Sequence, residues 1–249
     1  GVDWFVTSKI SWNETNTMPY DLFRWKGIDG TDVMAHYITT QNSYDGNPPR
    51  FTTYNGIASS AMVKATYERF IEKYITDKVM APVGWGDGGG GTTVQDCEIL
   101  KRHKKCLPAT PTAEWGHFGK LMAETREAAE SNKYTPVWAG ELYFEFHRKT
   151  YTSQAANKKA NRKSEFLLQN VESSAVIADA LGVSSFDKEK HDENWEIVLL
   201  NQFHDILPGS SVTETFERAK KEYASVKEYG DGAIIADLNA ISKKVADRG

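Results

Sequence analysis

A glycine-rich segment with one acid near its centre is the first place where the sequence indicates chemistry. Residues 84–93 read GWGDGGGGTT and lie between a strand-like run and a helical run. Ligands of α/β proteins bind beside the carboxyl ends of strands, where such loops lie. Glycines let the backbone approach a sugar, the face of Trp85 can cover apolar ring carbons, and Asp87 can serve a glycosidic oxygen. The segment therefore favours a carbohydrate site, and the alternative is a flexible turn with a solvated Asp87.

The same segment also fits a nucleotide-binding pattern. Residues 86–91 match G-x-G-x-x-G. Two features count against this reading, because Asp87 would face a pyrophosphate and no acid stands about twenty positions on to hold a ribose; the first beyond that point is Glu114. A P-loop would further need a Gly-Lys-Ser/Thr ending, which the segment lacks. A nucleotide-binding oxidoreductase remains a second hypothesis.

A histidine and an aspartate stand side by side at the predicted end of a helix. Residues 201–211 read NQFHDILPGSS, so that His204 and Asp205 precede a Pro-Gly turn. An imidazole at this place can point out of a helical bundle to bind a metal, and the neighbouring carboxylate can bind a ligand or a hydroxyl. A histidine at a helix end also interacts favourably with the helix dipole. The residues alone leave both roles open.

A third segment gathers carboxylates, aromatic rings, a histidine and an arginine. Residues 140–148 read GELYFEFHR. In a strand, Glu141, Tyr143 and Glu145 would share one face. That face is either part of a functional site or a surface edge stabilised by salt bridges.

The elements that position these segments change in character near residue 150. Before it, strand-like and helical runs alternate, which predicts an α/β fold with βα units around a largely parallel sheet. The predicted strands are 4–7, 33–38, 79–85 and 137–142, and the predicted helices are 57–74, 94–107 and 115–131. After it, apolar stripes predict four helical stretches, at 167–181, 195–203, 216–226 and 234–245, with Gly182 as a C-terminal cap. We therefore predict an α/β part at 1–150 and a helical bundle at 151–249.

Composition narrows the class of protein. The 249 residues are 40% hydrophobic and 26% charged, as in an ordinary globular protein with one or two cores. The net charge of −4 argues against a nucleic-acid partner, and no run approaches the roughly 20 apolar residues of a membrane span. Cys97 and Cys106 would lie on opposite faces of a helix, so no disulfide is expected, and we predict a cytoplasmic protein. Residues 1–9 run directly into a strand, so the chain is expected to begin inside a domain.

Taken together, these segments resemble the α-mannosidases of glycoside hydrolase family 38, especially their cytosolic and bacterial branch. NQFHDILPGSS is very like the zinc-ligand motif of that family, and GWGDGGGG is like its acid-bearing loop. GELYFEFHRKTYTSQAANKKANRKSE at 140–165 is like the junction into its helical domain, and FVTSKISWNETNTMPYDLFRWKGIDG at 5–30 fits too. The resemblance spans nearly the whole chain in the right order.

The resemblance implies a fold, an activity and a set of site residues. Residues 1–150 would be the C-terminal portion of a (β/α) barrel-like catalytic domain, and 151–249 a bundle of the three-helix type. The parent would be a zinc-dependent retaining α-mannosidase that removes terminal α-linked mannose from glycans. His204 would bind the zinc, Asp205 would contact the mannose, and Asp87 would be the general acid or its close partner. Trp85 would line the substrate site, as would Tyr44 and Asp45 within NSYDGN.

The sequence also departs from the family pattern. Lys149 stands where a glycine is usual, and Thr92 where a proline usually follows the glycine run, which bears on loop geometry more than on chemistry. The family draws other zinc ligands from a His-x-Asp pair and from the nucleophilic aspartate, and none of the six histidines here is followed two residues later by aspartate. A retaining mechanism needs two carboxyl groups roughly 5 to 5.5 Å apart, and zinc needs about four ligands. The chain is therefore expected to be an internal piece, without the C-terminal β domains of its relatives and inactive by itself.

Two further alternatives remain. A mannosylglycerate hydrolase shares the scaffold and differs in what it binds beyond the mannose. A non-catalytic interaction module would need only the helical part. Linkage preference and oligomeric state stay open.

Overall fold

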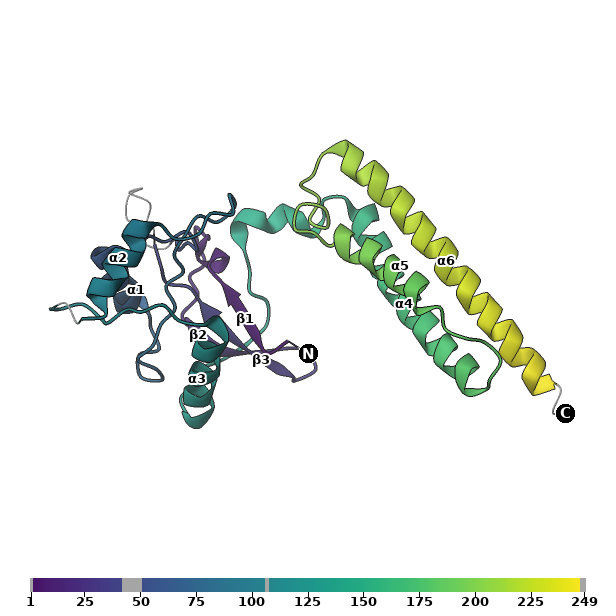
Figure 1. The fold of residues 1–249 in the computed structure, drawn as a ribbon, viewed down its shortest axis with the longest axis horizontal. Coiled ribbons are helices and arrows are strands. Elements are labelled where there is room, and N and C mark those ends of the chain that lie inside the picture. Colours follow the sequence, from purple (N-terminus) through teal and green to yellow (C-terminus); the bar gives the residue numbers. More distant parts are fainter. Residues whose placement is uncertain (1, 42–50, 106–107, 247–249) are drawn as a thin grey trace. The chain divides into compact units, whose positions relative to one another are not determined.

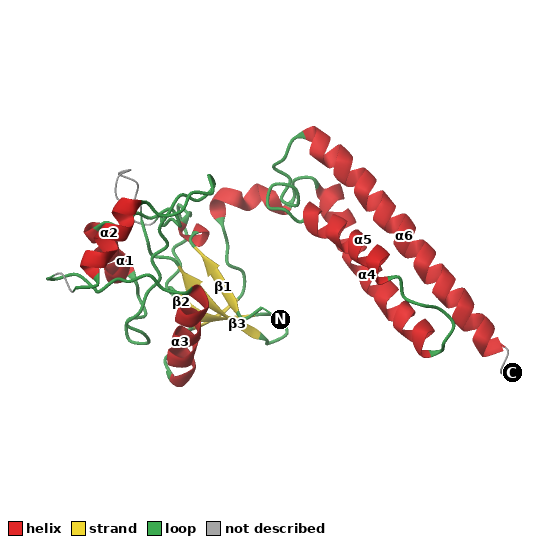
Figure 2. Cartoon of the chain, in the orientation of Figure 1, coloured by secondary structure: helices red, strands yellow, loops and turns green. Residues whose placement is uncertain are grey.

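The chain folds into two compact units, Gly1–His147 and Arg148–Gly249 (Figure 1). The structure is a computed structural model that describes residues 2–41, 51–105 and 108–246. The first unit combines a sheet with helices, and the second is helical (Figure 2).

The sheet of the first unit has four strands in the order β1-β3-β2-β4. They are β1 (Trp4–Thr7), β2 (Leu22–Lys26), β3 (Asp32–Tyr37) and β4 (Val137–Ala139). The pairs β1–β3 and β2–β4 are parallel, whereas β2 and β3 form an antiparallel hairpin, so the prediction of a largely parallel sheet holds only in part. The sheet is therefore mixed, and the hairpin strand β2 is missing from the sequence-based prediction. The described strands give an α/β fold, and the barrel remains a prediction.

One predicted strand is wrong. Residues 79–85 form no strand and contribute only isolated bridges, from Val83 to Gly56 and from Trp85 to Gly90. Pro82 in the middle of this run has no N–H to donate to a ladder. The chain passes here straight into the glycine-rich turn.

Two hydrophobic clusters cover the two faces of the sheet, because successive strand residues point to opposite sides. Leu22 and Phe23 are both fully buried but belong to different clusters. The first cluster is formed by Ile10, Phe23, Ala35 and Tyr37, and the second by Leu22, Met34, Phe70 and Ala129. The helices are α1 (Ser60–Arg69), α2 (Val94–His103) and α3 (Phe118–Ser131), each shorter than predicted. Phe70, just after α1, and Ala129 of α3 bring these helices over the second face.

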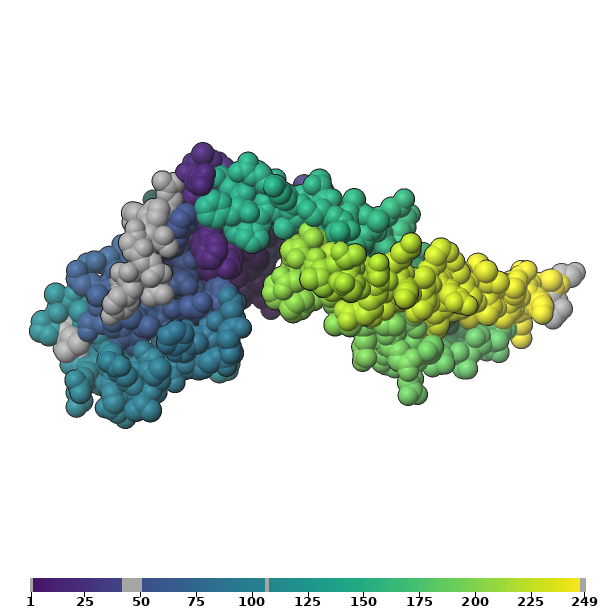
Figure 3. Space-filling view, turned by 90° about the horizontal axis from the view of Figure 1, so that it is seen from above, coloured from purple at the N-terminus to yellow at the C-terminus, as the bar shows by residue number. Residues whose placement is uncertain are grey.

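Three long helices make the second unit, after a short 3₁₀ segment Glu145–Tyr151 (η2). They are α4 (Ala155–Ala180), α5 (Lys188–Asn201) and α6 (Thr213–Ala246), and they pack on one another around Leu168, Val198, Ala219, Tyr223 and Val226. Figure 3 shows α6 running along the unit with α5 beside it. No helix among the described residues is long and apolar enough to cross a membrane.

Two glycines explain where these helices continue and where they stop. The last two predicted helical stretches are one helix, because Gly230 does not break α6 but lets it approach α4. A Cβ at this position would lie 2.5 Å from Leu167 Cγ. Gly182 confirms the predicted cap, with a φ of 64° that favours glycine. The Gly182 and Val183 amides donate to the Asp179 and Ala178 carbonyls at 2.8 and 3.0 Å, which is a Schellman motif.

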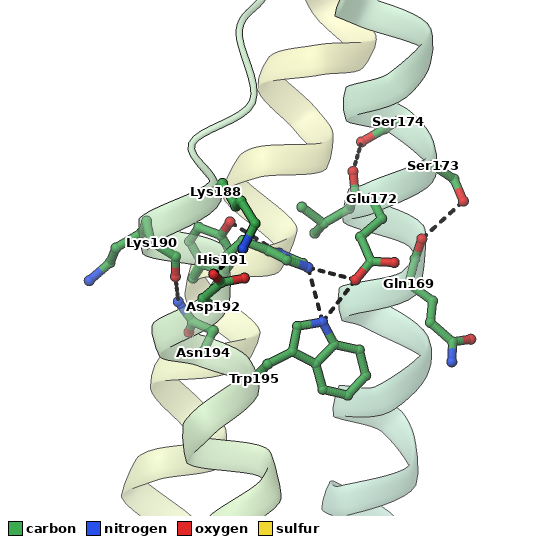
Figure 4. A network of polar contacts seen from close by, with 12 residues as sticks. Gln169, Glu172, Ser173, Ser174, Lys188, Lys190, His191, Asp192, Asn194 and Trp195 are labelled. Carbon is green, nitrogen blue, oxygen red and sulfur yellow. Dashed lines mark hydrogen bonds and ion pairs between the residues drawn. The ribbon is translucent and has the colours of Figure 1, made fainter. Parts of the chain in front are cut away.

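A polar cluster around the buried His191 joins the three helices (Figure 4). His191 Nε2 of α5 lies 2.8 Å from Glu172 Oε1 of α4, and Trp195 Nε1 donates to the same oxygen at 2.9 Å. Tyr229 of α6 places its hydroxyl 3.4 Å from His191 Nδ1. Because His191 is buried, losing one partner would leave polar atoms unsatisfied, so the cluster favours a single packing arrangement.

Candidate functional site

The glycine-rich segment is a closed, hydrogen-bonded turn. Trp85 and Gly90 exchange two backbone hydrogen bonds of 2.9 Å, and residues 86–89 form the turn between them. Asp87 has a φ of 63°, in the left-handed region that few non-glycine residues adopt. Its side chain is exposed at the tip, and Trp85 beside it is 60% exposed. The predicted acid and aromatic ring are therefore both presented at the surface of the first unit.

Three consecutive residues from an earlier part of the chain hold this turn. The Tyr54 hydroxyl donates to Asp87 Oδ1 at 2.7 Å, and Asn55 Oδ1 accepts from the Gly86 amide at 2.7 Å. The Gly56 carbonyl accepts from the amide of Gly84 at 3.0 Å. Neither Tyr54 nor Asn55 was predicted, because they precede the turn by about thirty residues and match no metal or acid motif. Only the Gly at the end of TYNG marks the segment as a bend.

A cation, Lys9, lies over the Tyr54 ring and over one further ring, that of Trp12. Lys9 Nζ is 3.9 Å from the centroid of the Trp12 ring and 5.0 Å from that of Tyr54. Trp12 Nε1 in turn donates to the Thr52 carbonyl at 2.8 Å. Cation–π contacts of this kind restrict ring orientation as well as contributing attraction. Lys9 and Trp12, which follow β1, thus contact residues 52–54, which lead into the segment that holds the turn.

Replacing Gly86 by alanine is expected to displace Asp87. A Cβ on Gly86 would lie 2.2 Å from Asn55 Oδ1 and 2.3 Å from Tyr54 Cε2, so both contacts would have to move. A displacement of about 1 Å at a catalytic group can cost about 100-fold in rate, so a loss of that order is expected in the kcat of the full-length protein.

The matched control is Gly88→Ala, because a Cβ on Gly88 meets nothing within 4 Å. Activity and thermal unfolding would be measured for both variants. Equal activity of Gly86→Ala and Gly88→Ala would contradict a role for the turn geometry.

His204 and Asp205 lie in a turn that begins where α5 ends. The helix ends at Asn201, a few residues earlier than predicted. The His204 side chain is 79% exposed and that of Asp205 is 58% exposed, with Nε2 3.7 Å from Oδ2. The ring of Phe203 lies 4.2 Å from the imidazole. The two predicted site residues are therefore together and available to a ligand.

The opposite side of this turn is fastened to α4. Lys158 Nζ donates to the carbonyls of Leu207 at 2.8 Å and Pro208 at 3.1 Å, and Asn157 Nδ2 donates to the Ile206 carbonyl at 3.3 Å. Burial lowers the pKa of Lys158. The turn is consequently fixed to α4 through its backbone carbonyls. These contacts do not use the side chains of His204 and Asp205.

The donors fit a zinc ion only in part. An imidazole and a carboxylate suit zinc, which takes about four ligands. Among the described residues, no three His, Cys, Asp or Glu side chains are grouped so as to hold a metal ion. The turn therefore offers at most two donors of a larger set.

The remaining predicted residues divide between the units and the undescribed part. Asp87 and Trp85 belong to the first unit, whereas His204 and Asp205 belong to the second, and each unit is described by itself. Tyr44 and Asp45 lie outside the described residues.

Glu145, from the third segment, has a structural position. The segment is not a strand, since Glu145 begins the 3₁₀ segment η2, and the residue is only 4% exposed. Its carboxylate accepts from the amides of Glu14 at 2.7 Å, Thr15 at 3.1 Å and Asn16 at 2.7 Å. Together with the Thr15 hydroxyl, which contributes most, these donors lower the pKa of Glu145 to about 2. Glu145 thus joins two distant stretches of the first unit.

Acid unfolding should report on Glu145. A carboxyl group whose pKa falls from 4.5 to about 2 on folding stabilises the protein above pH 4.5, and that stabilisation is lost as the pH falls towards 2. We expect Glu145→Gln to be destabilised at neutral pH and to show a smaller further loss in this window than the wild type. The measurement is thermal unfolding between pH 7 and pH 2, with the exposed Glu127→Gln as the control. An unchanged acid limb in Glu145→Gln would contradict the assignment.

Comparisons with known proteins agree along nearly the whole chain. Residues 1–141 match the family Glycosyl hydrolases family 38 N-terminal domain, and residues 145–241 match the Alpha mannosidase middle domain. Alpha-mannosidase G of Dictyostelium discoideum is 34% identical over 246 residues, which is 97% of this chain and 21% of that protein. Alpha-mannosidase of Saccharomyces cerevisiae is 34% identical over 228 residues, 87% of this chain and 20% of that protein.

A solved structure shares the fold. The crystal structure of an alpha-mannosidase from Enterococcus faecalis V583 aligns with a TM-score of 0.65 and 17% identity, over 90% of this chain and 25% of that one. The chain spans about a fifth of the length of the curated relatives it matches.

Proposed function

The chain belongs to glycosyl hydrolase family 38, and from that membership we propose that the full-length protein is a zinc-dependent retaining α-mannosidase. It would hydrolyse terminal α-linked mannose in glycans. The names of the relatives support this proposal, and they match 87 to 97% of the chain. Because the chain spans only about a fifth of those relatives, we propose that it is inactive by itself.

The observation that carries the proposal is Asp87, exposed at the tip of a closed turn and hydrogen-bonded by Tyr54. In the first step Asp87 would donate a proton to the leaving glycosidic oxygen, while a carboxylate from outside this chain attacks the anomeric carbon. In the second step Asp87 would accept a proton from the water that releases the mannose. The exposed face of Trp85 would cover the apolar side of a sugar ring.

The second unit would contribute to metal and substrate binding. His204 would bind the zinc through its imidazole, and Asp205 would contact a mannose hydroxyl, with the remaining donors supplied from outside the described residues. Bound zinc would supply a Lewis acid for sugar hydroxyls. Tyr44 and Asp45 are proposed to line the substrate site.

The geometry does not favour the nucleotide-binding alternative. In a dinucleotide site the pyrophosphate sits at the amino end of the helix after the glycine loop. Here that helix is α2, and Asp96 accepts from the Thr93 amide at 3.0 Å while Thr93 Oγ1 accepts from the Asp96 amide at 3.1 Å. The helix end therefore already holds a negative charge, which would repel a phosphate.

A cytoplasmic location is part of the proposal. It is supported by the low cysteine content of the chain.

The stereochemistry of the product tests the proposed activity. Full-length protein would be mixed with an α-mannoside and the first-formed mannose followed by proton NMR. A retaining enzyme releases the α anomer first, and the β-mannoside should not be cleaved. First release of the β anomer, or no cleavage at all, would refute the proposal.

A further inference from the structure

The turn that presents Asp87 is held by one short segment of chain, residues 54–56. Each of the three residues makes a different contact: Tyr54 with the Asp87 carboxylate, Asn55 with the Gly86 amide and Gly56 with the Gly84 amide. Only the first reaches the reacting group itself. Tyr54 is therefore the residue through which the protein can orient the carboxyl group rather than the backbone.

The segment is itself anchored at the carboxyl ends of two parallel strands. The Thr53 amide donates to the Thr40 carbonyl, shortly after β3, at 2.7 Å. The Thr52 amide donates at 2.9 Å to the Ser11 hydroxyl, shortly after β1. The backbone just before Tyr54 is thus anchored near the ends of two sheet strands, in addition to the contacts that residues 54–56 make with the glycine-rich turn.

We propose that Tyr54 is a positioning residue for Asp87, holding Oδ1 and leaving Oδ2 as the atom that carries the transferred proton. The proposal rests on the proposed function of Asp87 as acid and base. The hydroxyl donates to Oδ1 at 2.7 Å, a short distance typical of a bond from a hydroxyl to a carboxylate. With Oδ1 occupied, a proton on the carboxyl group belongs on Oδ2, on the side open to a leaving oxygen.

The charge distribution supports a donor role for Tyr54. The hydrogen bond to the Asp87 carboxylate raises the pKa of Tyr54, so its hydroxyl keeps its proton. Lys9, 5.0 Å from the centre of the Tyr54 ring, restricts the orientation of that ring further.

The test is Tyr54→Phe in the full-length protein, which removes one oxygen and keeps the ring. With mannosides of poor leaving groups, a loss in kcat/KM of about 10- to 100-fold is expected, as for a hydrogen bond to a charged group. With a strongly activated leaving group, protonation of that group matters little. The rate of the first step, in which the mannosyl-enzyme forms, should then fall much less. Tyr134→Phe is the control, since Tyr134 is 67% exposed in the same unit.

Asp87→Asn, measured alongside, separates this proposal from the proposed function. If Asp87→Asn shows no dependence on the leaving group, the acid role itself fails and the Tyr54 proposal with it. A second outcome is that Asp87→Asn shows that dependence while Tyr54→Phe keeps the wild-type kcat/KM on both kinds of substrate, or loses activity equally on both. In either case only the Tyr54 proposal is overturned. In an Asp87→Asn background the added Tyr54→Phe change should have little further effect, and a full additive loss would also overturn it.

Discussion

In the full-length protein, Asp87→Asn is expected to lower kcat/KM by about 100- to 10,000-fold toward mannosides with poor leaving groups, the usual contribution of a general acid. Toward mannosides with strongly activated leaving groups the first step needs no proton, and its rate should change far less. The amide is close in size to the carboxyl group and can still accept from the Tyr54 hydroxyl, so the turn should be retained. The measurement is a leaving-group series for the wild type and the variant.

The second step offers an independent check on the same variant. Without a base at position 87, hydrolysis of the mannosyl-enzyme should slow. Added azide should restore turnover, because an anionic nucleophile needs no deprotonation. The exposed Asp77→Asn, in the same unit, serves as the control. Equal losses of activity toward mannosides with activated and with poor leaving groups, with no effect of azide, would show that Asp87 is not the acid and base.

His204→Ala is expected to lose both bound zinc and activity. Mutating even an outer partner of a metal ligand costs about 10- to 100-fold in affinity or activity, so the loss of a direct ligand should exceed 100-fold. The imidazole is 79% exposed and the turn is fixed through its backbone by Lys158, so the substitution should leave the helical unit folded. Zinc per full-length protein would be measured by elemental analysis after dialysis, together with hydrolysis of an activated α-mannoside.

The control for this variant is His117→Ala. His117 is also exposed, and its side chain makes no capping hydrogen bond at the start of α3. Retention of zinc and activity in His204→Ala would show that His204 is not a zinc ligand and would leave it the structural role of a histidine at a helix end. Loss of activity with zinc retained would indicate contact with the substrate in place of the metal.

Local features of the chain were predictable because they depend on neighbouring residues. The strand at 4–7, the start of α2 at Val94 and the Gly182 cap follow from a short apolar run, a run of helical composition and a glycine just after the last apolar position of a helix. The order of the three motif segments was enough to indicate family 38, and the comparisons confirm that membership. The same local reading failed at β2, where Leu22 and Phe23 are buried on opposite faces and the alternation typical of a strand disappears.

The sequence by itself therefore determined the family, the α/β character and the positions of the candidate acid and metal ligand. Only the tertiary structure decided what holds them in place. Tyr54 meets Asp87 across 33 positions, and Glu145 meets Thr15 across 130. The continuity of α6 through Gly230 likewise depends on Leu167 of another helix. Such contacts form because folding brings distant segments together, and a single sequence carries no local periodicity or spacing that marks them.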